Sequence, residues 1–78
     1  MNVNTSATET SILAIIRQSG YGPMLSTREV AEFLGLSQGA IHKALVARRL
    51  LGLRIGSPRG RWRVPAVELA RFVCGRAA

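Results

Sequence analysis

The stretch that decides the fold is Thr27-Arg-Glu-Val-Ala-Glu-Phe-Leu-Gly-Leu-Ser-Gln-Gly-Ala-Ile-His-Lys-Ala-Leu-Val46. Two short helices that cross steeply need a small residue where they touch, and Ala31 supplies it. Gly35 follows an apolar periodic segment, at the place where a left-handed residue ends one helix before the next begins. Ile41 then anchors the second helix in the core. The spacing predicts a helix-turn-helix over these residues.

The other residues of this stretch separate into an inward set and an outward set. The apolar residues expected to face the core are Val30, Leu34, Leu36 and Leu45. The small or polar residues expected to face outward, where they can enter a DNA major groove, are Ser37, Gln38, Gly39, His42 and Lys43. A glycine weakens a helix by about 1 kcal/mol relative to alanine. Gly39 therefore indicates either tolerance near a helix end or close approach of the backbone to a partner.

Length and composition favour one small folded domain. A chain of 78 residues buries only ~60% of the surface that its unfolded form exposes, so the core must be compact. Its 47% hydrophobic and 19% charged residues are typical of a folded soluble domain. No apolar run is long enough to cross a bilayer, and residues 1–10 lack the basic and apolar order of a signal peptide. We therefore expect a cytoplasmic, nucleoid-associated protein.

The single cysteine and the single histidine limit the chemistry of the chain. Cys74 has no partner for an intrachain disulfide and is expected to fill space near the C-terminus. Because Cys74 is the only cysteine and His42 the only histidine, a zinc site of the usual multi-ligand kind is excluded. We expect no metal and no cofactor.

Positive charge is concentrated in the second half of the chain. The net charge is +7. Residues 1–42 carry two arginines against three glutamates, a balance of −1, whereas residues 43–78 carry nine basic residues against Glu68, a balance of +8. Ten of the eleven basic residues are arginines, whose forked donors suit phosphate and guanine. This distribution is typical of a phosphate-binding face.

A helix is predicted before the helix-turn-helix. Residues 1–7 are small and polar and are expected to be disordered, which leaves residues 8–78 as a single domain. Apolar residues then recur at helical spacing between Thr8 and Ser19, namely Ile12, Leu13, Ile15 and Ile16. Gly20, Gly22 and Pro23 end this helix. Its apolar stripe packs either on the helix-turn-helix or on a second copy, and we expect packing within the chain.

Capping residues mark the ends of the two central helices. Ser26 and Glu29 have the spacing of a capping box, so the second helix begins here and runs to about Leu34. Ser37 caps the third helix. We expect this helix to continue to the pair Arg48-Arg49, whose charges complement its C-terminal end.

After Gly52 the apolar period changes from helical to alternating, which predicts a two-stranded hairpin. The residues expected on its core-facing side are Leu53, Ile55, Trp62 and Val64. The residues expected on its outer side are Arg54, Arg61 and Arg63. Residues 56–60 supply the turn, with Arg59 at its tip.

A last helix completes the predicted fold. Pro65 suits its first turn, and Val67, Leu69, Phe72 and Val73 are available for burial. The predicted order is helix, helix-turn-helix, basic hairpin, helix. This order is mainly α with a small β-hairpin, which is a winged helix-turn-helix.

Four motifs follow one another at a definite spacing: Leu25-Ser-Thr-Arg-Glu-Val-Ala-Glu-Phe-Leu-Gly-Leu-Ser37, Arg54-Ile-Gly56, Gly60-Arg-Trp-Arg-Val64 and Glu68-Leu69. In this order they resemble the excisionase and MerR-like helix-turn-helix family. The resemblance covers about two thirds of the chain, from about Met24 to Val73, and leaves the first predicted helix outside it. No long coiled coil or effector domain follows, so we do not expect a full ligand-sensing regulator of the MerR type.

The resemblance implies a DNA-binding module of the kind used by phage and mobile-element excisionases and by small transcription regulators. It implies that the third helix enters the major groove and that the hairpin lies along the adjacent backbone or minor groove. The residues that it assigns to the groove helix are Ser37, Gln38, Gly39, His42 and Lys43. The residues that it assigns to the wing are Arg59, Arg61 and Arg63.

The chemistry of several side chains suggests more specific roles, each with a simpler alternative. Gln38 can pair with adenine and Lys43 with guanine, or both belong to a solvated helix face. His42 contacts a base or phosphate, titrates as a pH switch, or is an ordinary exposed polar residue. Thr27 and Arg28 stand where amides at a helix start can bind phosphate, or they serve only to begin the helix.

The leading hypothesis is sequence-specific binding of double-stranded DNA by a small phage, plasmid or mobile-element regulator, acting as a homodimer or a cooperative array. The alternative is an excisionase that bends DNA and directs a recombinase partner. A more distant alternative is binding of an anionic membrane surface by the basic C-terminal half. An enzyme is not expected, because the chain has no aspartate and its four glutamates form no paired site.

Overall fold

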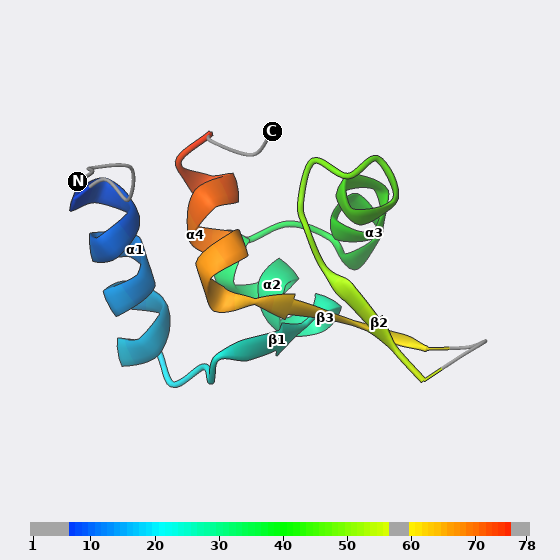
Figure 1. Ribbon diagram of the computed structural model, residues 1–78, viewed down its shortest axis with the longest axis horizontal. Coiled ribbons are helices and arrows are strands. Elements are labelled where there is room, and N and C mark those ends of the chain that lie inside the picture. The colour runs from blue at the N-terminus through cyan, green and yellow to red at the C-terminus, as the bar shows by residue number, and fades with distance from the viewer. Residues whose placement is uncertain (1–6, 57–59, 76–78) are drawn as a thin grey trace.

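The computed structural model describes residues 7–56 and 60–75, and within them it is a winged helix-turn-helix (Figure 1). In chain order its elements are α1 (Ala7–Gln18), β1 (Met24–Ser26), α2 (Thr27–Leu34), α3 (Gln38–Val46), β2 (Leu53–Ile55), β3 (Arg61–Pro65) and α4 (Ala66–Val73). All four predicted helices are present, within a few residues of the predicted bounds. Arg59, predicted to be a wing tip, and residues 1–6 of the predicted disordered start lie outside the described residues. Ala7, the last residue of that predicted start, is instead the first residue of α1.

The sheet has three strands, one more than the predicted hairpin. It is antiparallel with strand order β1-β3-β2, so β3 is the central strand. Leu25 of β1 lies opposite Val64 of β3, and both side chains are fully buried. The sequence did not reveal β1 because three residues are too few for an alternating pattern. This strand depends on β3 for its backbone hydrogen bonds.

The register of the hairpin corrects the predicted division of its two faces. It pairs Leu53 with Arg63, Arg54 with Trp62, and Ile55 with Arg61. Directly opposite residues share a face, so Leu53 and Ile55 lie on the same side as the two arginines of β3, where they are 55% and 58% exposed. The predictions that they face the core and that Arg54 shares the outer side with Arg61 and Arg63 were wrong, because alternation within each strand does not set the register between strands.

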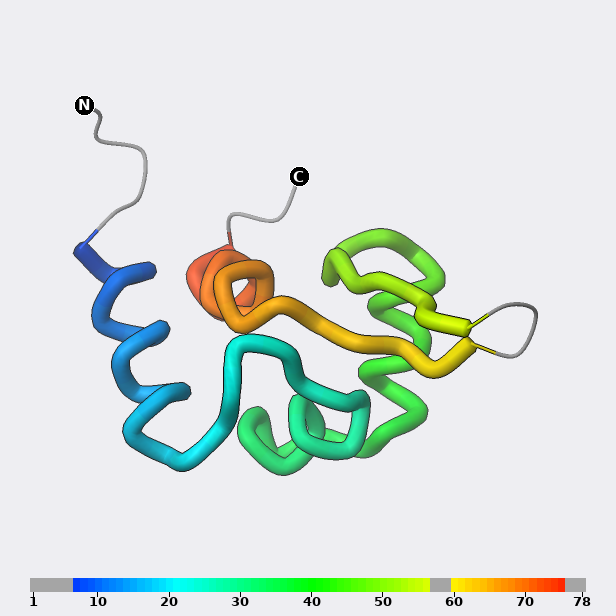
Figure 2. Tube along the Cα trace, turned by 60° about the horizontal axis from the view of Figure 1, so that its bottom comes forward, coloured from blue at the N-terminus to red at the C-terminus, as the bar shows by residue number. Residues whose placement is uncertain are grey.

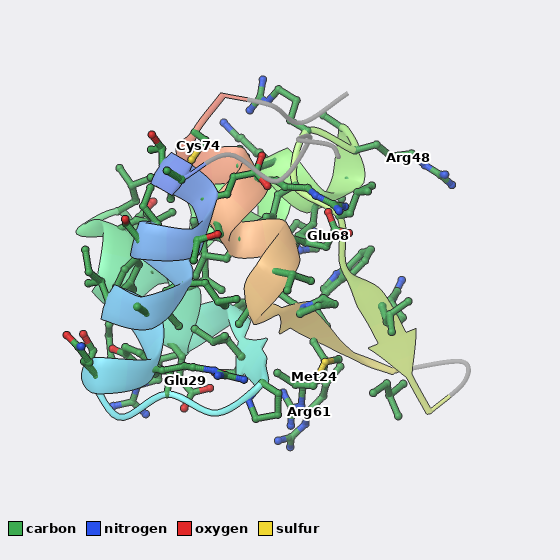
Figure 3. All side chains as sticks on the ribbon, turned by 60° about the vertical axis from the view of Figure 1, so that its left-hand side comes forward. Met24, Glu29, Arg48, Arg61, Glu68 and Cys74 are labelled. Atoms are coloured by element: carbon green, nitrogen blue, oxygen red, sulfur yellow. The ribbon has the colours of Figure 1, made fainter. Side chains whose placement is uncertain are left out.

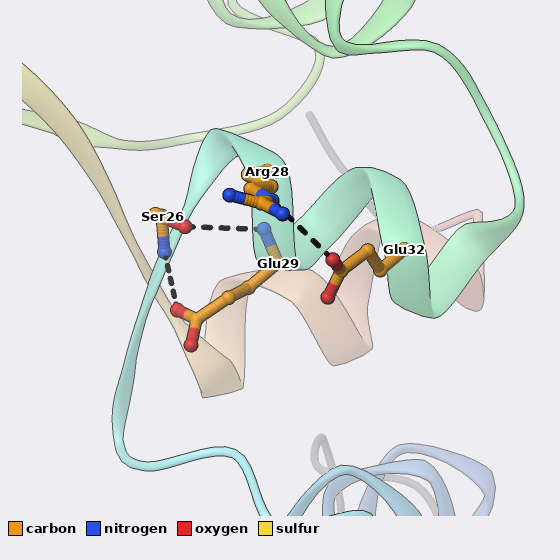
Figure 4. Close-up of polar contacts among 4 residues, drawn as sticks. All are labelled: Ser26, Arg28, Glu29 and Glu32. Atoms are coloured by element: carbon orange, nitrogen blue, oxygen red, sulfur yellow. Dashed lines mark hydrogen bonds and ion pairs between the residues drawn. The ribbon is translucent and has the colours of Figure 1, made fainter.

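The start of α2 carries the predicted capping box (Figure 4). The Glu29 amide donates to Ser26 Oγ at 3.1 Å, and the Ser26 amide donates to Glu29 Oε1 at 2.8 Å. Two amide donors that have no partner within the helix are thereby satisfied. The capping box holds the end of β1 and the first turn of α2 in one fixed conformation.

The turn between α2 and α3 is formed by Gly35, whose φ of 71° and ψ of 30° are left-handed as predicted. The amides of Gly35 and Leu36 both donate to the Ala31 carbonyl. The Leu36 side chain is 51% exposed, so its predicted inward position was wrong. The helical period ends where the chain reverses at Gly35, and a residue beyond that point no longer follows the apolar stripe.

The core lies between the helices and the inner face of the sheet. Its fully buried large side chains are Ile16, Leu25, Val30, Ile41, Leu50, Val64 and Leu69. Helix α2 packs directly on α3, and Ala31 and Ala44 are both buried. The burial of Ala31 agrees with the sequence prediction that a small residue is needed where the two helices meet.

Helix α1 packs within the chain, as expected, and its main partner is α4 (Figure 1). The two helices lie at one end of the molecule, and α3 and the β2–β3 hairpin lie at the other. Helix α4 buries Ala66, Leu69 and Ala70, whereas Val67 and Val73 remain exposed. The buried stripe of α4 is therefore narrower than its apolar sequence predicts.

Helix α3 ends at Val46, two residues before the predicted Arg48-Arg49 end. Arg48 has a φ of 61°, a left-handed conformation that costs a residue with a Cβ about 1–2 kcal/mol. The Arg49 and Leu50 amides then donate to the Ala44 carbonyl. The reversal directs Leu50 into the core, and its burial offsets the strain at Arg48.

The left-handed turn at Gly35 makes a stability prediction. Gly35→Ala should lower the free energy of unfolding by about 1–2 kcal/mol, because a Cβ is disfavoured at this φ. Urea denaturation followed by circular dichroism measures the change. Gly22→Ala is the matched control, because Gly22 has open space around it and no left-handed φ, and it should stay within about 0.5 kcal/mol of the wild type. Equal effects of the two substitutions would contradict the role of Gly35.

Candidate nucleic-acid interface

Helix α3 presents the predicted outward residues to solvent. Its buried side consists of Ile41, Ala44 and Leu45. The predicted contact residues of this segment are all exposed, namely Ser37, Gln38, Gly39, His42 and Lys43. The Ser37 hydroxyl accepts a hydrogen bond from the Ala40 amide at 3.1 Å, so Ser37 also begins the helix. The polar side of α3 is therefore open along its length.

Gly39 has no structural requirement within the described part of the chain. Its φ is not left-handed, and a Cβ added there would approach only Ser37 Oγ, at 3.9 Å. A glycine in a helix costs free energy relative to alanine, and nothing described around Gly39 offsets that cost. The absence of a side chain instead leaves a flat surface in the first turn of α3. A flat surface permits the backbone of a partner to approach closely.

A basic cleft brings together residues from two distant parts of the sequence. We define it by its lining residues, Ser26, Thr27, Arg28, Gly60, Arg61, Trp62 and Arg63. The first three belong to the junction of β1 with α2, and the other four belong to β3 and the residue before it. The cleft thereby joins four predicted contact residues, Thr27, Arg28, Arg61 and Arg63. Backbone amides at the start of α2 add a positive end of a helix dipole.

Arg28 forms an exposed ion pair with Glu32 of the same helix. Arg28 Nε lies 3.5 Å from Glu32 Oε2, and both side chains are largely exposed, so the pair is weak (Figure 4). Partial burial raises the pKa of the Tyr21 hydroxyl above its ordinary value of 10.0, and Glu32 and Glu29 raise it further. Tyr21 therefore remains neutral beside Glu32. Arg28 can exchange its exposed carboxylate partner for a phosphate at little cost.

The two predicted arginines of β3 are held differently. Arg61 is exposed, and its side chain extends away from the protein body (Figure 3). Arg63 is half-buried, and its Nη1 donates to the Trp62 carbonyl at 3.2 Å. Arg61 is therefore the more available of the two for an external anion, whereas Arg63 forms part of the cleft wall.

Arg54 is a basic residue of the wing that the predicted contact set lacks. Its guanidinium carbon lies 5.4 Å from the centroid of the Trp62 ring, and its Nε donates to the Gly60 carbonyl at 3.4 Å. Trp62 packs against the core, and its Nε1 is buried without a hydrogen-bond partner among the described residues. The strand register places Arg54 opposite Trp62, and alternation within each strand does not reveal that pairing from the sequence.

The candidate surface combines three elements at one end of the molecule. Helix α3 and the β2–β3 hairpin lie at the same end, with α2 beside them (Figure 2). Within residues 7–56 and 60–75, no three His, Cys, Asp or Glu side chains gather closely enough to hold a metal ion. None of the described helices is long and apolar enough to cross a membrane. The surface offers exposed polar groups and arginines for binding.

Comparison with known protein families finds one match. A family model described as a helix-turn-helix domain matches residues 24–77. The match begins at the first residue of β1 and extends beyond α4, so it contains the basic cleft and α3 and leaves α1 outside. No match was found among curated proteins or among solved structures.

The contact of Arg54 with Trp62 makes a prediction about the wing. Arg54→Ala should lower the free energy of unfolding by about 0.5–1 kcal/mol, the value of an exposed cation–π contact. Urea denaturation followed by the fluorescence of Trp62, the single tryptophan, measures this change. Arg61→Ala, on the opposite face of the hairpin, is the control and should change stability less. If both variants unfold at the same urea concentration, Arg54 does not stabilise the wing.

Proposed function

The chain belongs to the excisionase-like helix-turn-helix family and is therefore a DNA-binding protein, and from this premise we propose that it is a small transcriptional regulator that binds specific sequences in double-stranded DNA. The observations that support the proposal are the basic cleft, which brings Arg28, Arg61 and Arg63 together, and the exposed polar side of α3. Phosphate contacts supply affinity and orientation, whereas contacts with base edges supply specificity. This surface offers groups for both.

The proposed contacts divide between the two parts of the surface. In α3, we assign reading of base edges to Gln38 and Lys43, which suit adenine and guanine respectively, with His42 beside them. In the basic cleft, we assign phosphate contacts to Thr27, Arg28, Arg61 and Arg63. Arg59 lies outside the described residues, and we keep for it the sequence-based proposal of a contact in the adjacent minor groove.

A single domain of this size offers few base contacts, so we propose that it binds as a homodimer or as a cooperative array. We further propose that a phage, plasmid or other mobile element encodes it and that it acts in the cytoplasm on nucleoid DNA. The same surface would suit an excisionase that bends DNA beside a recombinase. The location of its binding sites decides between these roles: promoters indicate regulation, whereas recombination attachment sites indicate excision.

The test of the proposed function is selection of bound duplexes from a random library, followed by titration at several salt concentrations. If four to six phosphates are neutralised, log affinity should fall with log salt at a slope of about −4 to −5. Arg61→Ala should weaken all duplexes alike and reduce that slope by about 1, whereas Gln38→Ala should relax preference at one base position. Equal losses on selected and random DNA for Gln38→Ala would remove it from base reading, and no duplex binding at all would overturn the proposal.

Gly39 leads to a prediction in which stability rises while duplex affinity falls. Gly39→Ala should raise the free energy of unfolding by roughly 0.5 kcal/mol, because alanine is the better helix former. The same substitution should lower duplex affinity by about tenfold, because the added methyl group separates α3 from DNA and weakens a contact worth about 1–3 kcal/mol. Fluorescence anisotropy with a labelled duplex measures affinity, and urea denaturation measures stability.

Gly22→Ala, in the loop between α1 and β1, is the control and should leave affinity unchanged. A Gly39→Ala variant that is more stable and binds as well as the wild type would exclude close backbone approach at this position.

A further inference from the structure

Val46 is an apolar residue on the polar side of the helix proposed to read DNA. It is 63% exposed, more than any other large hydrophobic residue in the described part of the chain. The buried side of α3 is formed by Ile41, Ala44 and Leu45, so Val46 contributes little to the core. An exposed valine near the end of a helix has low helix propensity and gains nothing from packing. Its position on the helix points to an external contact.

The helical period places Val46 in line with the proposed reading residues. Three exposed residues follow the exposed Gly39 by three, four and seven positions, namely His42, Lys43 and Val46. Seven residues turn the helix by about 700°, so Val46 lies within roughly 20° of the direction of Gly39 and about 10 Å farther along the axis. The same spacing is used by the groove-reading residues of homeodomains. A helix lying along a major groove would bring Val46 about three base-pair steps from Gly39.

The major groove contains one apolar group that a valine can recognise. Thymine carries a 5-methyl group there, and cytosine, adenine and guanine do not. We propose that Val46 contacts the 5-methyl group of a thymine, about three base pairs from the base beside Gly39, and so makes this residue a determinant of sequence specificity. The proposal rests on the proposed function, because it requires α3 to lie in the major groove.

The test replaces single thymines by uracil in the duplex selected from a random library. Uracil pairs as thymine does and lacks only the methyl group. For the wild type, one substitution should lower affinity by about fourfold, which corresponds to the burial of one methyl group. For Val46→Ala, the duplexes with thymine and uracil at that position should bind equally. Val46→Thr, which retains one methyl group, should keep part of the discrimination.

Leu51→Ala is the matched control, because Leu51 is a half-exposed apolar residue outside α3. It should discriminate thymine from uracil as the wild type does. A wild type that selects a sequence but binds every uracil duplex as well as the thymine duplex overturns the role of Val46 and leaves the proposed function intact. A wild type that selects no sequence overturns both, and discrimination that survives in Val46→Ala assigns the methyl contact to another residue.

Discussion

The left-handed backbone at Gly35 is the constraint on which the rest of the structure depends. It ends α2 and allows α3 to pack on it, with Ala31 of α2 and Ala44 of α3 both buried. Once this packing is set, Ile41 and Leu45 can enter the core only if the opposite side of α3 faces solvent. The exposure of Gln38, His42 and Lys43 is thus a consequence of how the core closes, and it needs no stabilising contact of its own.

Helix α3 carries a local conflict at each end. Gly39 stands in the first turn, where alanine would be the better helix former, and Arg48 adopts a left-handed φ just beyond the last turn, where glycine would be less strained. Burial of Ile41, Leu45 and Leu50 holds the segment despite both. Such conflicts are expected where a surface serves a partner as well as the fold. Because core packing on one side holds α3 in place, the residues on its other side can serve binding without being needed for stability.

Much of the fold and part of the candidate site could be predicted because they depend on neighbours in the sequence. The capping box of Ser26 and Glu29 and the turn at Gly35 each involve residues within five positions of one another. The exposure of the polar residues of α3 follows from helical periodicity in the same way. Local patterns could not predict strand β1, or the face of the sheet on which Leu53 and Ile55 lie, because both depend on pairing with β3.

The sequence by itself determined the presence of the four helices, the N-caps of α2 and α3, the turn between these two helices, and the concentration of arginines in the second half of the chain. Only the tertiary structure decided that Thr27 and Arg28 line one cleft with Arg61 and Arg63, and that Arg54 lies against Trp62. Local structure follows from hydrogen bonds and periodicity within a few residues. A surface built from segments more than thirty residues apart follows from strand register and core packing, which no local pattern contains.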